Sequence, residues 1–249
     1  MAAPVAAPVA AATVIAHMYN EEYLLPFWLR HHLPMFQHGI IIDYASTDRS
    51  VEIVKEICPT WVVIQSRNDT FDLKAEDAEV MDIETTIPAG FKITLTIAEF
   101  LVVDSWPMSV AGQNLKIQVF AALGSVGSEP ADNAELFSSI EALHKSCRFG
   151  HRFMHECPHG MYQLGRHVSN RPSQFIDTVR IIWFGIHPWN SKQLLRKQQM
   201  VGRIPAVYTQ AGAGSQHEWN LDQWESYRAH KLADAPELVL PETIGLKKA

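Results

Sequence analysis

Short apolar runs alternate with helical patterns over residues 13–101 of the chain. An apolar run bounded by turn residues is typical of a buried strand, and such runs occupy residues 13–16, 39–43, 61–64 and 91–96. Between the runs, apolar positions at helical spacing predict helices over 20–36, 48–58 and 74–86. Strands that alternate with helices build a parallel sheet covered on both faces. The sequence therefore predicts an α/β fold with a central, mostly parallel sheet flanked by helices.

The rest of the chain is less regular. Residues 102–129 have the composition of loop and strand. We expect helices over 131–145, 191–201 and 221–232 and a glycine-rich turn over 212–219. No linker-like stretch separates the two halves (13–101 and 102–249), so we expect a single domain over 13–249 with an irregular C-terminal part. Residues 1–12 contain only Ala, Pro and Val after the first Met. Because they lack a positive n-region, we expect a flexible leader and not a signal peptide.

Composition excludes several classes of protein. The net charge is −6 without a basic block, which argues against general nucleic-acid binding because that requires a cationic surface. No apolar run reaches the roughly 18 residues of a membrane-spanning helix. From these absences we expect a cytoplasmic protein without an integral membrane segment, and peripheral docking at a membrane stays open.

The end of the second predicted strand carries the first candidate chemistry. Asp43 closes the apolar run 39–42, and Ser46, Thr47 and Asp48 are all suitable N-cap residues for the following helix. Asp43 is therefore expected at the carboxyl end of a strand and beside a helix N-terminus. Open α/β sheets bind ligands at that edge, and helix N-termini favour phosphate there.

Several motifs resemble family 2-like glycosyltransferases with the GT-A fold. Residues 19–22 (Tyr-Asn-Glu-Glu) follow the first strand, and residues 42–48 (Ile-Asp-Tyr-Ala-Ser-Thr-Asp) end the second. Shorter pieces are similar to the branch found in bacteria and large algal viruses: 98–101, 162–167, 188–190, 203–205 and 212–217. The resemblance implies a GT-A fold and a hexosyl- or deoxyhexosyltransferase. Its partners would be a nucleotide-diphosphate sugar, a UDP-sugar by the family pattern, and a glycan acceptor.

The same resemblance implies roles for residues of the nucleotide-binding half, 13–101. Asp43 would contact the nucleotide base through a charge-assisted hydrogen bond. His17 and Tyr19 would line the base and ribose beside Asn20. Arg67 follows the third strand and would bring its guanidinium towards the nucleotide.

In the acceptor or closing half, 102–249, three residues are candidates for contact with the acceptor or a phosphate. Arg166 and His167 belong to a segment that matches the family branch. Trp189 stands beside an expected site loop, and its ring could stack on a sugar face.

One departure from the family pattern concerns the metal. The family carries two aspartates after the fourth strand that hold a divalent ion, and here Thr96 and Ala98 occupy their positions. Glu99 is retained, so it is the candidate for catalysis or for metal contact. Mn²⁺ or Mg²⁺ often uses few carboxylates together with phosphates, and Glu99 with His217 could hold one. The alternatives are that cationic side chains replace the metal, or that the site has lost catalysis and serves as a nucleotide- or glycan-binding module.

Two further groups of residues are ambiguous. Arg196, Lys197 and Arg203 are expected to form mainly a solvated helix face, from which one side chain could contact phosphate. Histidines crowd residues 144–167, and His151 and His155 would share a face of a helix. We expect these histidines at the surface or in an acceptor pocket, ahead of a zinc site or a metal hydrolase.

Overall fold

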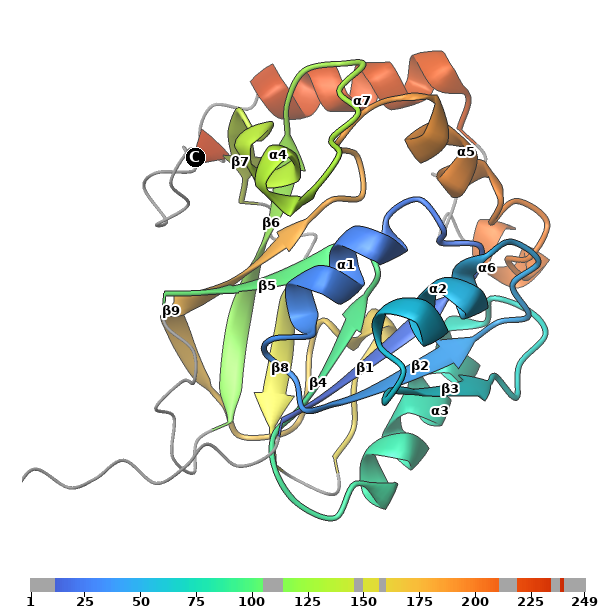
Figure 1. Cartoon of the computed structure of the whole chain (residues 1–249), viewed down its shortest axis with the longest axis vertical. Helices are drawn as coiled ribbons and strands as arrows, with labels where there is room; N and C mark the ends of the chain where they lie inside the picture. The colour runs from blue at the N-terminus through green and yellow to red at the C-terminus, as the bar shows by residue number, and fades with distance from the viewer. Residues whose placement is uncertain are drawn as a thin grey trace, which may run out of the picture.

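The computed structural model describes residues 12–104, 114–145, 150–156, 160–210, 219–233 and 238–239. In these residues a twisted sheet is covered by helices on its two faces (Figure 1). Residues 1–11 of the expected leader 1–12, most of the glycine-rich turn 212–219 and His217 lie outside the described residues. None of the described helices is long and apolar enough to cross a membrane.

The N-terminal half alternates strands and helices as the sequence predicts. Its elements are β1 (Thr13–Met18), α1 (Leu25–His32), β2 (His38–Asp43), α2 (Ser50–Ile57), β3 (Val62–Gln65), α3 (Leu73–Thr86) and β4 (Lys92–Thr96). These strands pair in parallel in the order β3-β2-β1-β4. The α/β class is therefore confirmed, and the carboxyl ends of the parallel strands meet at one edge.

The C-terminal half extends this sheet with mostly antiparallel strands. Its elements are β5 (Glu99–Val103), β6 (Leu115–Leu123), α4 (Asn133–Ser138), β7 (Ala142–His144), β8 (His151–His155), β9 (Gln174–Trp183), α5 (Ser191–Gln198), α6 (Ala206–Gln210), α7 (Leu221–Ala233) and β10 (Leu238–Val239), with the single turn η2 (Leu164–Arg166). β8 lies antiparallel between β4 and β6, and β5 pairs with β9, which joins β6. Two predictions for this half need correction. The helix predicted over 131–145 is the short α4 followed by β7, and His151 and His155 lie on β8 and not on a helix.

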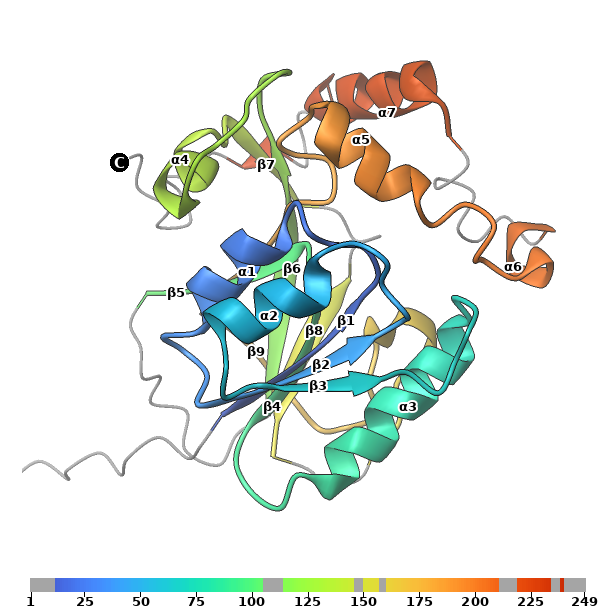
Figure 2. The same ribbon diagram turned by 45° about the vertical axis from the view of Figure 1, so that its right-hand side comes forward.

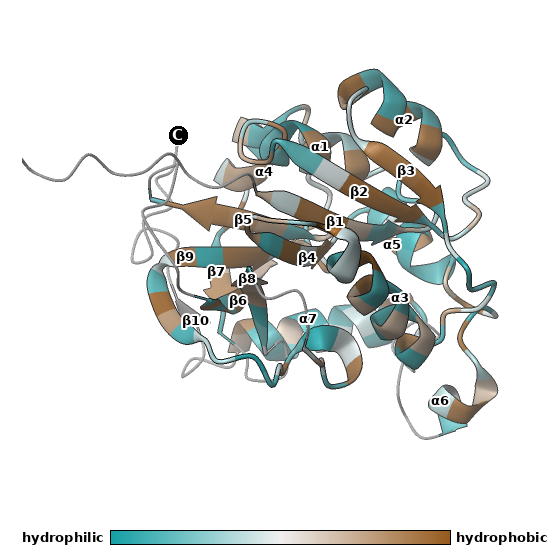
Figure 3. Ribbon diagram, turned by 90° about the horizontal axis from the view of Figure 1, so that it is seen from below, coloured by the Kyte–Doolittle hydropathy of each residue, from teal (hydrophilic) through white to brown (hydrophobic). Residues whose placement is uncertain are grey.

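The parallel strands are apolar on both sides because helices cover both faces. α1 and α2 lie on one face and α3 on the other (Figure 2). Successive side chains of a strand point to opposite faces of the sheet. Val14 and Ile41 therefore belong to the large core beneath α1 and α2, whereas Ile15 and Ile42 pack against Val80 of α3. Hydrophobic residues accordingly concentrate on the strands (Figure 3).

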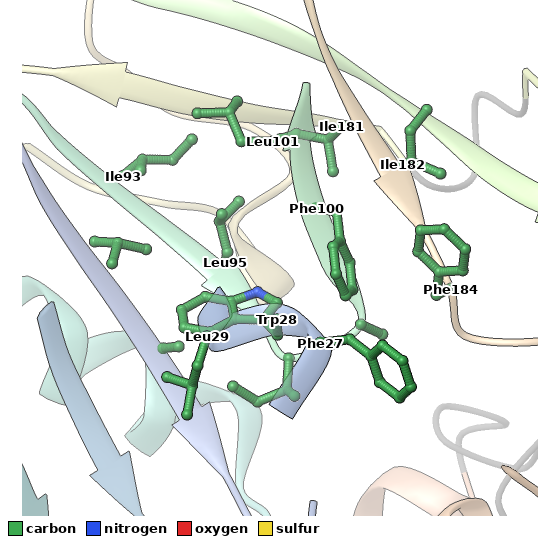
Figure 4. Packing of buried hydrophobic residues seen from close by; sticks show 14 of the residues in the cluster. Phe27, Trp28, Leu29, Ile93, Leu95, Phe100, Leu101, Ile181, Ile182 and Phe184 are labelled. Carbon is green, nitrogen blue, oxygen red and sulfur yellow. The ribbon is translucent and has the colours of Figure 1, made fainter. Parts of the chain in front are cut away.

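Trp28 lies in the middle of the larger core. Its ring lies among Leu29, Leu95 and Phe100, and it is fully buried (Figure 4). Its indole N–H donates to the backbone oxygen of Glu99 at 2.8 Å. Because Tyr and Trp donors usually find a partner when buried, this bond joins α1 to the start of β5.

The inner face of α3 is acidic, which is unusual for a buried helix face. Glu76, Asp77, Glu79 and Glu84 are all buried there. Buried carboxylates require charged or hydrogen-bonding partners. Glu84 accepts from Arg171 at 2.6 Å, from Tyr162 at 2.7 Å and from His155 at 3.2 Å. The C-terminal half is thus attached to α3 through ion pairs.

Arg171→Met should strongly destabilise the fold, because it leaves Glu84 buried with one cation fewer. Breaking a buried ion pair from one side costs about 3–5 kcal/mol. Urea denaturation measures the free energy of unfolding. The matched control is Arg49→Met, since Arg49 is 62% exposed in its pairs with Glu52 and Glu56, and exposed pairs contribute about 0–1 kcal/mol. Equal losses in the two variants would contradict the structural role of Arg171.

Candidate functional site

Two loops at the carboxyl edge of the sheet are joined by the side chain of Asn20. Its Oδ1 accepts from the backbone N–H groups of Thr47 at 2.7 Å and Asp48 at 3.3 Å, and its own N–H donates to Ser46 Oγ at 3.0 Å. Asn20 adopts a φ of 50°, a left-handed conformation that Asn tolerates better than most residues. The loop after β1 is therefore fixed to the loop after β2.

This arrangement corrects two expectations. α1 begins at Leu25 and not at residue 20, because Asn20 leaves helical geometry. α2 begins at Ser50, and of the three predicted caps Asp48 alone bonds into it, accepting from Ser50 N at 2.9 Å. Ser46 and Thr47 instead bond to the neighbouring loop. The polar residues of both motifs build the edge of the sheet.

A cavity of about 220 Å³ opens at this edge. It is bounded by the carboxyl ends of β1, β2, β4 and β9, by the last residues of the loop between β3 and α3, by the first turn of α3, and by α5. The residues that line it are His17, Met18, Tyr19, Glu21, Tyr44, Phe71, Glu76, Thr96, Ile97, Ala98, Trp183, Gly185, Arg196, Lys197 and Met200. The predicted location of the site at the strand ends matches the position of this cavity. Figure 1 shows the arrowheads of β2 and β3 pointing towards the side where α5 and α6 lie.

One wall of the cavity is aromatic. Tyr19, Tyr44 and Phe71 line it, and the rings of Tyr44 and Phe71 lie 6.4 Å apart between centroids. The Arg203 guanidinium lies 3.8 Å from the centre of the Tyr19 ring, where it holds that ring in place. Such a wall suits a flat heterocycle, because stacking on aromatic side chains accepts any base.

The opposite wall is cationic and comes from α5. Arg196 pairs with Glu21, with Nη2 2.7 Å from Oε1 and a second contact from Nε to Oε2. Lys197 is 6% exposed and lies over the rings of Trp224 (4.1 Å) and Trp183 (5.4 Å). Within the described part of the chain, its Nζ donates no hydrogen bond to a protein acceptor.

Burial sets the protonation of this wall. It lowers the pKa of Lys197 well below the ordinary lysine value, and the charge of Arg196 lowers it further while Glu21 opposes the shift. Burial also raises the pKa of Glu21, against the effect of Arg196. The expectation that Arg196 and Lys197 form a solvated helix face is therefore wrong. Trp183, Trp224 and the cavity enclose that face of α5.

The floor of the cavity carries polar atoms without protein partners. Among the described residues, His17 Nε2, Glu76 Oε2 and Thr96 Oγ1 are buried and make no hydrogen bond. Burial and the charge of Arg166 lower the pKa of His17 well below its ordinary value, so its imidazole is neutral. Buried polar groups normally have partners, and unsatisfied ones at a cavity wall therefore indicate a place where a ligand binds.

Other residues of the predicted nucleotide site lie beside the cavity and not on its wall. Asp43 is buried, and its Oδ1 accepts from Ser46 N at 3.1 Å in the turn after β2. Arg67 is 60% exposed and pairs with Asp82 at 2.8 Å and with Glu79 at 3.7 Å. Of the five expected residues, His17 and Tyr19 line the cavity, Asn20 and Asp43 shape its edge, and Arg67 points elsewhere.

Glu99 lies in a buried ion pair behind the cavity. Arg152 Nη2 lies 2.7 Å from Oε1 of Glu99, and its Nε donates to Oε2 at 2.9 Å. The backbone N–H of Thr96 donates to Oε2 at 2.9 Å. Both oxygens are thus engaged, whereas metal contact or proton abstraction requires one that faces the ligand.

The donor set expected for Mn²⁺ or Mg²⁺ is not assembled by the described residues. Thr96 and Ala98 line the cavity where the family has aspartates, and a hydroxyl and a methyl group are poor substitutes for carboxylates. No group of three or more His, Cys, Asp or Glu side chains in the described ranges is placed to hold a metal. This also removes support for the zinc reading of the histidines, as far as they are described.

The three candidates from the closing half have structural contacts. Arg166 pairs with Asp77 at 2.5 Å and with Glu76 at 3.0 Å. His167 Nδ1 lies 2.8 Å from Nη1 of Arg152. Trp189 is 2% exposed and packs with Trp224 in a separate core, so it offers no free face for a sugar. Arg166 nevertheless affects two residues of the cavity. It holds Glu76 through an ion pair, and its charge adds to the effect of burial in lowering the pKa of His17.

Sequence reasoning missed Glu76 as a site residue and assigned Lys197 to the wrong environment. Glu76 looks like any acidic residue of a first helical turn. One feature of the sequence could have indicated that Lys197 is buried. α5 contains few apolar residues, so its apolar side chains are too few to cover the rings of Trp183 and Trp224. The lysine stem covers these rings instead.

No family model matches this chain, and no curated protein matches it. Solved structures are similar at low identity. A mannosyltransferase (PcManGT) from Pyrobaculum calidifontis, in complex with GDP-Man and Mn²⁺, is 14% identical over 46% of this chain and 37% of its own, with a TM-score of 0.34. S. aureus TarS 1–349 with UDP is 14% identical over 59% and 46%, with a TM-score of 0.40.

A third solved structure is the glucosyl-3-phosphoglycerate synthase from Mycobacterium tuberculosis, in complex with Mn²⁺, UDP and glucosyl-3-phosphoglycerate. It is 13% identical over 45% of this chain and 44% of its own, with a TM-score of 0.32. The matches cover less than half the length of each of these three proteins.

Lys197→Met should stabilise the free protein at pH 7. Burial of this amine disfavours its charged form, and methionine removes the amine while keeping the apolar stem. Because the folded-state pKa is lowered, the unfolded chain binds the extra proton, and wild-type stability rises with pH towards the ordinary lysine pKa of about 10.4.

Urea denaturation at pH 7 and pH 9.5 should therefore show that the advantage of Lys197→Met shrinks at the higher pH. Lys192→Met on the same helix is the control, because Lys192 is 56% exposed in its pair with Glu129. A loss of stability in Lys197→Met at pH 7 would contradict a buried amine without an acceptor.

Proposed function

We propose that this protein is a glycosyltransferase that takes a sugar from a nucleotide-diphosphate donor, a UDP-sugar in the first instance, and transfers it to a glycan acceptor. The observation that carries the proposal is the cavity itself. An aromatic wall, a polar floor and two cations converge where the parallel strands end. α/β sheets bind nucleotides at this edge, and the motifs at residues 19–22 and 42–48 support the same reading.

In this proposal each wall binds a different part of the donor. The base stacks against Tyr19, Tyr44 and Phe71, and the diphosphate lies against Arg196 and Lys197. The approach of a diphosphate favours the protonated form of Lys197, since an opposite charge raises the pKa of an amine. The nucleotide half supplies the aromatic wall and the floor, and α5 of the other half supplies the cations.

The two cations also supply the chemistry that transfer requires. When the glycosidic bond to the diphosphate breaks, negative charge grows on the leaving oxygens. Once the bound diphosphate favours the protonated form of Lys197, both basic side chains stabilise that charge from fixed positions in a site shielded from water. We propose that Arg196 and Lys197 take the place of the divalent ion that the family holds with two aspartates, since Thr96 and Ala98 offer no carboxylate there.

A second candidate function is a nucleotide- or glycan-binding module without catalysis. The observation that favours it is the engagement of Glu99 by Arg152 and Thr96, which withdraws the retained acid from the cavity. Release of UDP from a UDP-sugar, measured with and without glycan acceptors, separates the two functions. Turnover that disappears in Lys197→Met supports the transferase, whereas tight UDP binding without any turnover supports the binding module.

Calorimetric titration should show that UDP and UDP-sugars bind the wild-type protein, and that excess EDTA leaves the binding intact. Lys197→Met should weaken the affinity for UDP about 10- to 100-fold, because a hydrogen bond to a charged group contributes about 1.5–3 kcal/mol. Lys192→Met should bind as the wild type does. Absence of nucleotide binding, with or without Mn²⁺, would overturn the proposed function, and binding that requires Mn²⁺ would overturn the role of the cations.

A further inference from the structure

The floor of the cavity contains a carboxylate that is held from behind and has one oxygen free. Arg166 Nη2 donates to Oε1 of Glu76 at 3.0 Å, while Oε2 has no partner among the described residues. Glu76 is 3% exposed and lines the cavity. A buried carboxylate oxygen is an expensive group to leave without a hydrogen bond.

His17 supplies a second free polar atom beside it. Its Nδ1 lies 3.0 Å from Glu76 Oε1 without forming a hydrogen bond of good geometry, and its Nε2 has no partner in the described chain. The ring is 8% exposed and neutral. A neutral imidazole has one N–H and one bare nitrogen, so it can donate or accept according to its tautomer.

Arg166 does not line the cavity and holds Glu76 in place. It bonds Glu76 and Asp77 at once, with its own φ at 61°. Non-glycine residues seldom adopt that conformation, and where they do the surrounding structure over-determines it. Glu76 is therefore held firmly, as a binding residue should be.

We propose that Glu76 and His17 bind two vicinal hydroxyls of the nucleotide sugar, and that the ribose of the nucleotide supplies them. The inference rests on the proposed function, and it names the part of the donor that the cavity floor binds. Each hydroxyl both donates and accepts, so a diol satisfies the carboxylate oxygen and the imidazole in either tautomer. A phosphate oxygen would be repelled by Glu76, and an apolar group would leave both atoms unsatisfied.

The position of the floor assigns the diol to the ribose. The ring of His17 lies 5.4 Å from that of Tyr44 between centroids, so the floor adjoins the aromatic wall on which the base stacks. A ribose lies next to its base. Carboxylates at strand ends bind ribose hydroxyls in other nucleotide-binding α/β folds, although here the carboxylate comes from α3. The hydroxyls of the transferred sugar are the other source of the same chemistry.

The test compares affinities for UDP, 2′-deoxy-UDP and UDP-glucose in three proteins. The wild type should prefer UDP over 2′-deoxy-UDP about 10-fold, in line with the loss of one hydrogen bond to a charged group. Glu76→Gln should bring that ratio close to one. Glu79→Gln is the matched control, because it neutralises another buried carboxylate of α3 that lies off the cavity wall and is held by Ser66 and Arg67 instead of Arg166. It should keep the wild-type ratio, and thermal denaturation checks that both variants fold.

The remaining outcomes are distinct. If Glu76→Gln leaves the ratio of UDP to 2′-deoxy-UDP unchanged but weakens UDP-glucose relative to UDP, the diol belongs to the transferred sugar and the ribose assignment is wrong. If the wild type binds UDP and neither ratio changes, the inference fails while the proposed function stands. If the wild type binds no nucleotide, the proposed function fails and the inference fails with it.

Discussion

The pairing of Arg166 with Glu76 and Asp77 is the interaction on which the candidate site depends. It joins the middle of the chain to α3 across 89 and 90 residues of sequence, and it determines two properties of the cavity floor. It holds Glu76 with one oxygen free, and the charge of Arg166 adds to the effect of burial in lowering the pKa of His17. A buried ion pair is a weak source of net stability, so its value here is geometric. It fixes charged groups in positions that a hydrophobic core would not hold.

Several groups around the cavity lower the stability of the free protein. Burial lowers the pKa of Lys197, and His17 and Glu76 have buried polar atoms without a partner among the described residues. A fold under selection for stability alone would replace such groups. Strained or unsatisfied groups concentrate at functional sites because binding satisfies them. The aromatic wall, the cationic wall and the polar floor each lack a different kind of partner, and a nucleotide diphosphate contains all three.

The sequence predicted the parallel half of the fold well, because its signals are local. The runs ending at Asp43 and Thr96 are apolar and bounded by turns, and α3 was predicted within one residue at its start. In the C-terminal half, α5 and α7 begin at the predicted residues Ser191 and Leu221, whereas the strands were predicted poorly. β7 is three residues long and β6 pairs with strands distant in sequence, so tertiary contacts decide those elements. Periodicity cannot reveal such contacts.

The sequence predicted the edge of the sheet at which the cavity opens, but only some of the residues that line it. The strand-end motifs pointed to this edge, and His17 and Tyr19 line the cavity. The same motifs pointed to Asp43 and Glu99, whose carboxylates are bonded to protein groups in this structure. Their partners lie in the turn at Ser46 and on β8 at Arg152. A single sequence does not show which carboxylate a distant arginine will neutralise, and the same limit hid Glu76.

The decisive experiment is a crystal structure of the protein with UDP, because it shows where each part of a nucleotide lies. We expect the base against Tyr44 and Phe71, the ribose hydroxyls within hydrogen-bond distance of Glu76 and His17, and the diphosphate against Arg196 and Lys197. A nucleotide bound outside this cavity, or bound within it with its diphosphate on the Glu76 side, would overturn the proposed binding mode.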